Sequence, residues 1–241
     1  MKNVLITGGS GDIGSEIVTH LAESNFKIFF TYYKNYKNSK KLFQNLKKKN
    51  KKIFFFKVSN KSQKEIINTL KKIKIKHGSV DILINNAGKS QLIDFTKITK
   101  KNFDEIIDVN LKGAFFWCQE IIKDMKRKKF GRIINIASIG GQWGGEEQIH
   151  YAISKAGVIC LTKSLAKTFS KYGITTNCIS PGLIDTKMIK KKNFKKKIKI
   201  IPSKRIGKTL DLLSTIDFLI DQRSSYVTGQ TINVNGGMFF S

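Results

Sequence analysis

Tyr151 and Lys155 stand four residues apart in a helix-forming stretch, and this spacing places their side chains on one face of a helix. A phenol with a pKa of about 10 is a poor base at neutral pH, but an adjacent ammonium lowers that pKa and favours the phenolate. Ser138 lies thirteen residues before Tyr151 and directly after an apolar run. Many Tyr-x-x-x-Lys pairs are ordinary surface pairs, so the prediction of an acid/base site depends on the rest of the chain.

Two turns rich in small residues precede this pair. The first, Thr7-Gly8-Gly9-Ser10-Gly11-Asp12-Ile13-Gly14, links an apolar run to a helix-forming stretch. Its backbone amides can approach a pyrophosphate at the positive end of the helix, although glycine turns also serve only to reverse a chain. The second follows the fourth apolar run and can hold backbone close to a dinucleotide. The predicted dinucleotide-binding residues in the two turns are Gly8, Ser10, Asp12, Ile13, Gly14, Asn86, Ala87 and Gly88.

The end of the second apolar run bears on which dinucleotide binds. It reads Thr31-Tyr32-Tyr33-Lys34 and contains no Asp or Glu that could bind a ribose 2′-hydroxyl. With lysines at 34 and 37, the sequence favours a 2′-phosphate and therefore NADPH. NADH stays possible, because these lysines can also belong to a general lysine excess.

Apolar runs alternate with amphipathic, helix-length stretches along the whole chain. Strands separated by helices need crossover connections, so we expect one doubly wound parallel sheet of the Rossmann type with helices on both faces, formed by a single domain of residues 1–241. Ligands of such sheets bind beyond the carboxyl ends of the strands. The predicted strands are Lys2–Thr7, Phe26–Tyr32, Lys52–Val58, Asp81–Asn85, Gly131–Ala137, Thr175–Ser180 and Thr231–Val234. The predicted helices are Ile13–Ser24, Ser39–Lys49, Lys61–His77, Lys101–Lys128, Tyr151–Tyr172 and Thr209–Asp221.

The 241 residues carry a formal net charge of +28, with 41 lysines and only four arginines. Nucleic-acid readers use arginine forks, so a lysine excess spread along the chain indicates composition bias rather than a specific nucleic-acid site. Dense clusters occur at Lys47–Lys52 and Lys187–Lys199. Salt-sensitive, nonspecific association with polyanions is expected.

Neither a membrane span nor a leader peptide is expected, because no apolar run reaches about 18 residues and strand-like sequence begins at Val4. The sequence therefore predicts a cytoplasmic location. Cys118, Cys160 and Cys178 are far apart among apolar neighbours. We expect them to be reduced core residues, with no disulfide and no metal site.

These features together resemble the short-chain dehydrogenase/reductase family over nearly the full length of the chain. The residues that carry the resemblance are the glycine turn, Asn85-Asn86-Ala87-Gly88, Asn110, Ser138, Tyr151, Lys155, Pro181-Gly182 and the terminal run from Tyr226 to Met238. Within the family, the length, the spacing from Ser138 to Tyr151 and the Gly-Gly-Met ending are most similar to the 3-oxoacyl-[acyl-carrier-protein] reductases.

The resemblance implies hydride transfer from a nicotinamide to a carbonyl carbon, with Tyr151 giving a proton to the oxygen. It also implies that Ser138 polarises that oxygen, that Lys155 lowers the tyrosine pKa and binds the nicotinamide ribose, and that Asn110 holds a water in a proton relay. An asparagine at 110 could instead tie a helix to a strand. The resemblance extends the cofactor site to Thr31, Lys34, Val58, Tyr151, Lys155, Pro181, Gly182 and Ile184.

Several positions depart from the family pattern. Asp12 replaces a usual glycine and is expected to cap the following helix, and Gly11 replaces an arginine found in many NADPH-using relatives. Lys57 stands where Asp or Asn commonly meets the adenine. Four residues expected around the site are bulkier or more charged than a fatty-acyl tunnel would need, which keeps a polar substrate possible: Trp143, Glu146, Glu147 and His150.

Three functions therefore remain open. The first is reduction of a 3-oxoacyl thioester on acyl carrier protein in fatty acid synthesis, and the second is the same chemistry on a sugar, a polyol or another small alcohol or ketone. The remote third is a noncatalytic dinucleotide- or polyanion-binding protein. Residues 183–203 are predicted to form a mobile substrate loop, whose lysines could dock an acidic carrier protein or could reflect composition alone. The resemblance implies a homotetramer, and the segment from Tyr226 to Ser241 would expose apolar residues in a monomer.

Overall fold

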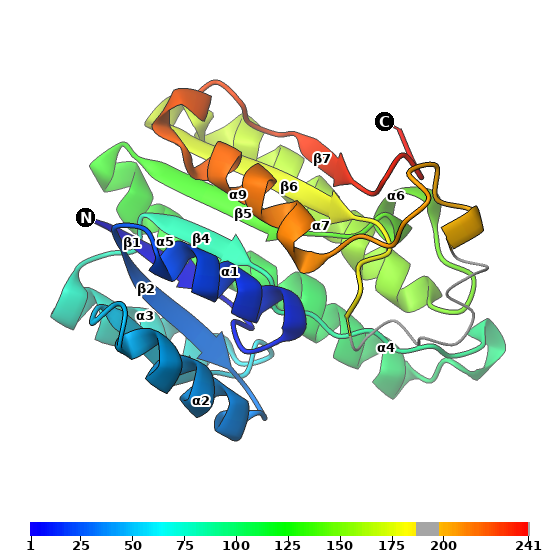
Figure 1. Cartoon of the computed structure of the whole chain (residues 1–241), viewed down its shortest axis with the longest axis horizontal. Coiled ribbons are helices and arrows are strands. Elements are labelled where there is room, and N and C mark those ends of the chain that lie inside the picture. Colours follow the sequence, from blue (N-terminus) through cyan, green and yellow to red (C-terminus); the bar gives the residue numbers. More distant parts are fainter. Residues whose placement is uncertain (187–197, 241) are drawn as a thin grey trace.

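The computed structural model describes residues 1–186 and 198–240 and contains a seven-stranded, fully parallel sheet (Figure 1). The strand order is β3-β2-β1-β4-β5-β6-β7, so the chain winds outward in both directions from β1 and β4. The strands are β1 (Lys2–Ile6), β2 (Phe26–Tyr32), β3 (Ile53–Lys57), β4 (Ile82–Asn85), β5 (Gly131–Ile136), β6 (Ile174–Pro181) and β7 (Thr231–Val234). The doubly wound α/β fold predicted from the sequence is confirmed.

Helices cover both faces of the sheet, because successive side chains of each strand point to opposite faces. In β1, Val4 and Ile6 pack with the helices α1 (Asp12–Ala22), α2 (Tyr36–Lys47) and α9 (Leu213–Ile220). Leu5, between them, packs on the other face with α3 (Gln63–His77) and α5 (Gly113–Lys128). The long helix α7 (Ile149–Phe169) covers β6 on that second face, where Val158 packs against Cys178.

The predicted helix Lys101–Lys128 is interrupted. It consists of α4 (Lys100–Ile107), a π-helical turn η2 (Asp108–Lys112) and α5. The side-chain amide of Asn60 donates a hydrogen bond to the carbonyl oxygen of Val109 (3.1 Å) and so satisfies an acceptor within the wide turn. Gly113 permits this approach, because a Cβ there would lie 2.6 Å from Asn60 Nδ2.

Other boundaries shift for local reasons. Helix α2 begins at Tyr36 rather than Ser39, because the side chain of Asn35 caps it by accepting from the N–H of Asn38. Asp12 is not the cap of α1; Gly11 occupies that position and Asp12 is the first helical residue. The ends of two predicted helices are 3-10 turns, η3 (Ser170–Tyr172) after α7 and η4 (Thr209–Leu212) before α9. Short elements that the sequence pattern did not predict are η1 (Phe95–Lys97), α6 (Gly140–Trp143) and η5 (Gln222–Ser224).

Cys118 and Cys178 are buried free thiols, as expected, whereas Cys160 is exposed on α7. The prediction of a core position for Cys160 is therefore wrong: apolar neighbours in sequence do not share one face of a helix. In the described part of the chain, no helix is both long and apolar enough to cross a bilayer. Among the same residues, no group of three or more His, Cys, Asp or Glu side chains is arranged around a common metal position.

Residues 187–197 of the predicted substrate loop lie outside the described residues, and so do all but Lys199 of the lysines in its cluster. Both ends of the loop are held. Asp185 donates its N–H to the carbonyl of Gly207 (2.8 Å), and Ser203 donates its N–H to the carbonyl of Gly236 (3.0 Å).

Candidate active site

The glycine turn lies at the carboxyl end of β1 and leads directly into α1. Gly8 has a φ of +63°, and a Cβ there would lie 2.8 Å from the Cα of Ala87. At Gly14 a Cβ would meet the carbonyl oxygen of Gly8 at 2.3 Å and the side-chain amide of Asn86 at 2.7 Å. Glycine is thus required at both positions, for a left-handed backbone at the first and for close packing at both.

The two predicted dinucleotide turns are joined by hydrogen bonds. Thr7 Oγ1 accepts from the N–H groups of Asn86 and Ala87, both at 3.0 Å. The side-chain amide of Asn86 returns two bonds, to the carbonyls of Thr7 (3.0 Å) and Gly8 (3.1 Å). The turns therefore form one rigid surface at the centre of the sheet, where a dinucleotide binds in this fold.

Tyr151 lies in the first turns of α7 and is 9% exposed. Burial raises the pKa of its phenol, and a hydrogen bond with the Ser138 side chain partly opposes that rise. Ser138 follows β5 and also accepts the N–H of Gly140 (3.2 Å). The lowered tyrosine pKa expected from the sequence is therefore not produced by this chain's own residues, because the loss of solvent outweighs the hydrogen bond.

Lys155 lies one helical turn beyond Tyr151 and is 5% exposed. Its Nζ donates to the carbonyl of Ile136 (2.7 Å) and lies 5.7 Å from the centroid of the Tyr151 ring. Burial lowers the pKa of the ammonium to about 8, although Cys178 nearby acts in the opposite direction. The predicted pair thus shares one face of α7, pointing toward the end of β5.

Asn110 is buried in the π turn, and its side chain makes three hydrogen bonds. Oδ1 accepts the N–H of Lys89 (2.8 Å), while Nδ2 donates to the Lys89 carbonyl (2.9 Å) and to Ser154 Oγ (3.0 Å). Ser154 in turn donates to the carbonyl of Tyr151 (2.7 Å). The amide therefore ties η2 to the loop after β4 and to α7.

The residues predicted to contact the outer parts of the cofactor differ in burial. Thr31 is buried and its Oγ1 accepts the N–H of Gly8 (3.1 Å), so this side chain acts on the glycine turn. Lys34 is exposed just beyond β2, with Nζ 5.9 Å from the centroid of the Tyr33 ring. Val58 is buried, and its N–H is taken by the carbonyl of Tyr32 (2.8 Å).

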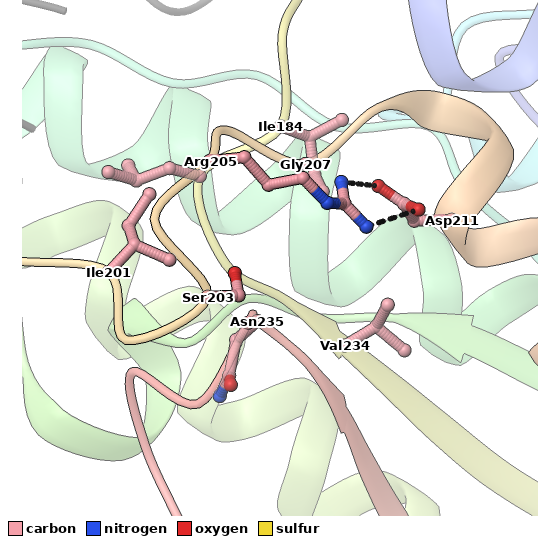
Figure 2. Close-up of a pocket in the computed structure, with 10 residues that line it drawn as sticks. Ile184, Ile201, Ser203, Arg205, Gly207, Asp211, Val234 and Asn235 are labelled. Carbon is pink, nitrogen blue, oxygen red and sulfur yellow. Dashed lines mark hydrogen bonds and ion pairs between the residues drawn. The ribbon is translucent and has the colours of Figure 1, made fainter. Parts of the chain in front are cut away.

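The remaining predicted residues follow β6. The carbonyl of Pro181 accepts from Ile139 (3.0 Å), and Gly182 donates its N–H to the carbonyl of Val234 (3.0 Å). Ile184 is buried and lines a cavity of about 70 Å³. The other lining residues come from the segment between β6 and α9 and from the end of β7. Figure 2 shows the guanidinium of Arg205 pointing at the carboxylate of Asp211 beside this cavity, in an ion pair with bonds of 2.6 and 2.9 Å.

The chain matches a known protein family. The family model described as short chain dehydrogenase matches residues 2–197. The chain belongs to the short-chain dehydrogenase family. Among curated short-chain dehydrogenases, proteins named "3-oxoacyl-[acyl-carrier-protein] reductase FabG" are similar to it over the full length. Identity is 35% for that of Staphylococcus epidermidis (strain ATCC 35984), with 99% of both chains covered, and 36% for that of Buchnera aphidicola subsp. Schizaphis graminum, with 100% of this chain and 98% of the relative covered. For Rickettsia typhi it is 39%, with 98% of this chain and 96% of the relative covered.

Family membership gives the chain a nicotinamide dinucleotide as cofactor, and the buried lysine fits that group. An ammonium has three N–H donors. One of those of Lys155 goes to Ile136, and no acceptor for the others is found among the described residues. Gly88 leaves space beside it, since a Cβ there would lie 3.5 Å from Lys155 Nζ. A ribose hydroxyl would satisfy these donors.

Sequence reasoning missed the residues that hold the site in place. The sequence pattern gives Thr7 no role beyond its place in the glycine turn, yet its hydroxyl joins both dinucleotide turns. Ser154 is fully buried and contacts both Asn110 and Tyr151. The main chain of Lys89 is hydrogen-bonded to the side chain of Asn110. No residue pattern signals such roles, because they depend on contacts between segments far apart in the sequence.

Proposed function

We propose that this short-chain dehydrogenase uses NADPH to reduce the 3-oxo group of an acyl thioester carried on acyl carrier protein, giving the 3-hydroxyacyl thioester. The observation that carries the chemistry is the convergence of Ser138, Tyr151 and Lys155 at the ends of β5 and α7. The full-length similarity to proteins named 3-oxoacyl-[acyl-carrier-protein] reductase supports the substrate.

In this proposal the bound cofactor supplies a hydride to the carbonyl carbon. Tyr151 donates its proton to the carbonyl oxygen, and burial suits this role because a raised pKa keeps the phenol protonated at neutral pH. The Ser138 hydroxyl donates to the same oxygen and stabilises the charge that develops there. The Lys155 ammonium binds the ribose and stabilises the phenolate left after proton transfer, so one side chain serves binding and chemistry.

The test is turnover with NADPH and with NADH on acetoacetyl thioesters of acyl carrier protein and of N-acetylcysteamine, beside a panel of sugars and polyols. We expect reduction of the carrier-bound thioester with the highest kcat/KM. Efficient turnover of a sugar or polyol instead, with no activity on either thioester, would contradict the proposed substrate and leave the assigned chemistry intact.

The preference for NADPH is supported by the exposed Lys34 and by the absence of a carboxylate near the end of β2. We expect Lys34→Glu to weaken NADPH binding at least tenfold and to leave NADH binding within about twofold, because only NADPH carries the 2′-phosphate. Lys52→Glu is the matched control, with the same charge change at the amino end of β3. Equal losses of NADPH affinity in both variants would mean that the overall charge of the protein, and not a local contact with Lys34, affects binding.

We also propose a homotetramer built on two-fold interfaces, in line with apolar side chains near the C-terminus that face solvent in one chain. Tyr226 is 99% exposed and Phe240 is 82% exposed. Burying such surface is favourable, and most soluble oligomers are symmetric homo-oligomers. Size-exclusion chromatography with light scattering tests this, and a monomeric mass at micromolar concentration would contradict it.

A further inference from the structure

Gln91, Glu105 and His150 form a chain of polar contacts beside the proposed active site, and none of them takes part in the proposed chemistry. Gln91 Nε2 donates to Glu105 Oε2 (3.2 Å), and Gln91 Oε1 lies 3.4 Å from His150 Nε2. Glu105 also pairs with the ammonium of Lys89 (2.7 Å). The chain thus runs from α4, through the loop after β4, to the residue that precedes Tyr151.

The direction of each hydrogen bond follows from the chemistry of the partners. The Lys89 ammonium holds the pKa of Glu105 below its usual range, so this carboxylate is ionised and can only accept. Gln91 must therefore turn its NH₂ group toward Glu105 and its carbonyl oxygen toward His150. Because that oxygen can only accept, His150 must carry a proton on Nε2.

The other ring nitrogen fixes the charge of His150. The residue is 1% exposed, and its Nδ1 has no hydrogen-bond partner among the described residues. A second proton on the ring would create a buried N–H without an acceptor among the described residues, which is unfavourable. Burial accordingly lowers the pKa of His150, which favours the neutral ring.

We propose that His150, as the neutral Nε2–H tautomer, is a positioning residue that holds Gln91 and the loop of residues 89–93 against the first turn of α7. The inference rests on the proposed function, because positioning is meaningful only if Tyr151 and Lys155 carry the reaction.

The contact between His150 and Gln91, here called the tether, is one of several between this loop and the start of α7. The loop is joined to the segment before α7 at two further points, by Ser90 Oγ donating to Gln148 Oε1 (2.8 Å) and by the Ile93 N–H donating to the carbonyl of Glu147 (2.8 Å). Gly88, the residue directly before this loop, lies beside Lys155, since a Cβ there would be 3.5 Å from Lys155 Nζ. Loss of the contact between His150 and Gln91 would leave the loop attached to α7 at fewer points, and misplacement of groups beside Lys155 by about 1 Å can cost a large factor in rate.

The first test is spectroscopic. The chain has three histidines, so selective ¹⁵N-histidine labelling of the full protein gives three resolvable rings. We expect one ring at pH 7.5 to be protonated at Nε2 alone and to be perturbed by Gln91→Leu. The control Gln63→Leu removes an exposed glutamine on α3 and should leave that ring unchanged. A His150 ring protonated on Nδ1, or insensitive to Gln91→Leu, would overturn the proposal.

The second test is kinetic, with NADPH and the N-acetylcysteamine thioester. His150→Leu should lower kcat about tenfold with the thioester KM within twofold, because His150 is almost fully buried and has little surface that a substrate could contact. His150→Gln should recover most of the rate, since its side-chain N–H can replace that of Nε2. Equal losses in the two variants, or none in His150→Leu, would contradict positioning.

Gln91→Leu provides the same test at a half-buried position if His150→Leu fails to fold. The proposed function can fail separately. An inactive wild-type protein whose NADPH affinity falls in His150→Leu and returns in His150→Gln would reject the reductase proposal and keep the tether.

Discussion

The side chain of Asn110 grips the main chain of Lys89 from both sides, with Oδ1 accepting its N–H at 2.8 Å and Nδ2 donating to its carbonyl at 2.9 Å. A third bond reaches Ser154 in α7. One amide therefore fixes the π turn, the loop after β4 and the helix that carries Tyr151 and Lys155 relative to one another.

Asn110→Ala should destabilise the protein by about 2–4 kcal/mol, because it removes these three bonds and leaves buried polar groups unpaired. Urea unfolding measures the change. Asn38→Ala, at an exposed position on α2, is the control and should change the free energy of unfolding by no more than about 0.5 kcal/mol. Similar small effects in both variants would show that the hydrogen bonds of the Asn110 side chain contribute nothing to stability.

Gly14→Ala should damage the glycine turn, whereas Gly11→Ala should be tolerated. At Gly14 the new Cβ would lie 2.3 Å from the carbonyl oxygen of Gly8, while at Gly11 the nearest atom is that same oxygen at 3.4 Å. Overpacking of this kind costs about 1–3 kcal/mol. We expect Gly14→Ala to lower both thermal stability and cofactor affinity, as measured by melting with and without NADPH. A Gly14→Ala protein that matches Gly11→Ala in both measurements would refute the close packing.

Lys155→Met should change the pH dependence of stability in a defined direction. Burial lowers the pKa of Lys155 to about 8, below the value of about 10.4 for an unfolded lysine. Between these values the unfolded chain holds a proton that the folded chain has lost, so the contribution of Lys155 to stability rises with pH across this window and is lowest below pH 8. Relative to the variant, the wild type should gain about 2–3 kcal/mol between pH 7 and pH 10.5 in urea unfolding. A difference independent of pH would mean that this lysine titrates normally.

The sequence predicts the sheet and the closeness of Tyr151 to Lys155 because both depend on local or periodic features. Buried parallel strands are continuous apolar runs, and Tyr151 and Lys155 are close along one helix. The glycine turn is also local, since a positive φ at Gly8 and a crowded Cα at Gly14 leave a direct signature in residue type.

Features that depend on distant contacts could not be predicted. The π turn inside the helix predicted at 101–128 is accompanied by a bond from Asn60, almost fifty residues earlier in the chain. The tyrosine pKa is set by burial, which residue spacing does not reveal. The bond between Thr31 and the Gly8 N–H likewise appears only when β2 lies beside β1.

Tyr151→Phe tests the central claim most directly, because it removes one hydroxyl from a buried ring and leaves the packing nearly unchanged. The measurement is kcat for NADPH-dependent reduction of the 3-oxoacyl thioester, with NADPH affinity and thermal stability determined on the same preparation. General acid catalysis contributes about 10²- to 10⁴-fold, so we expect kcat to fall at least 100-fold while both other quantities stay close to the wild type. A variant that keeps more than a tenth of the wild-type rate would contradict the assignment of Tyr151 as the proton donor.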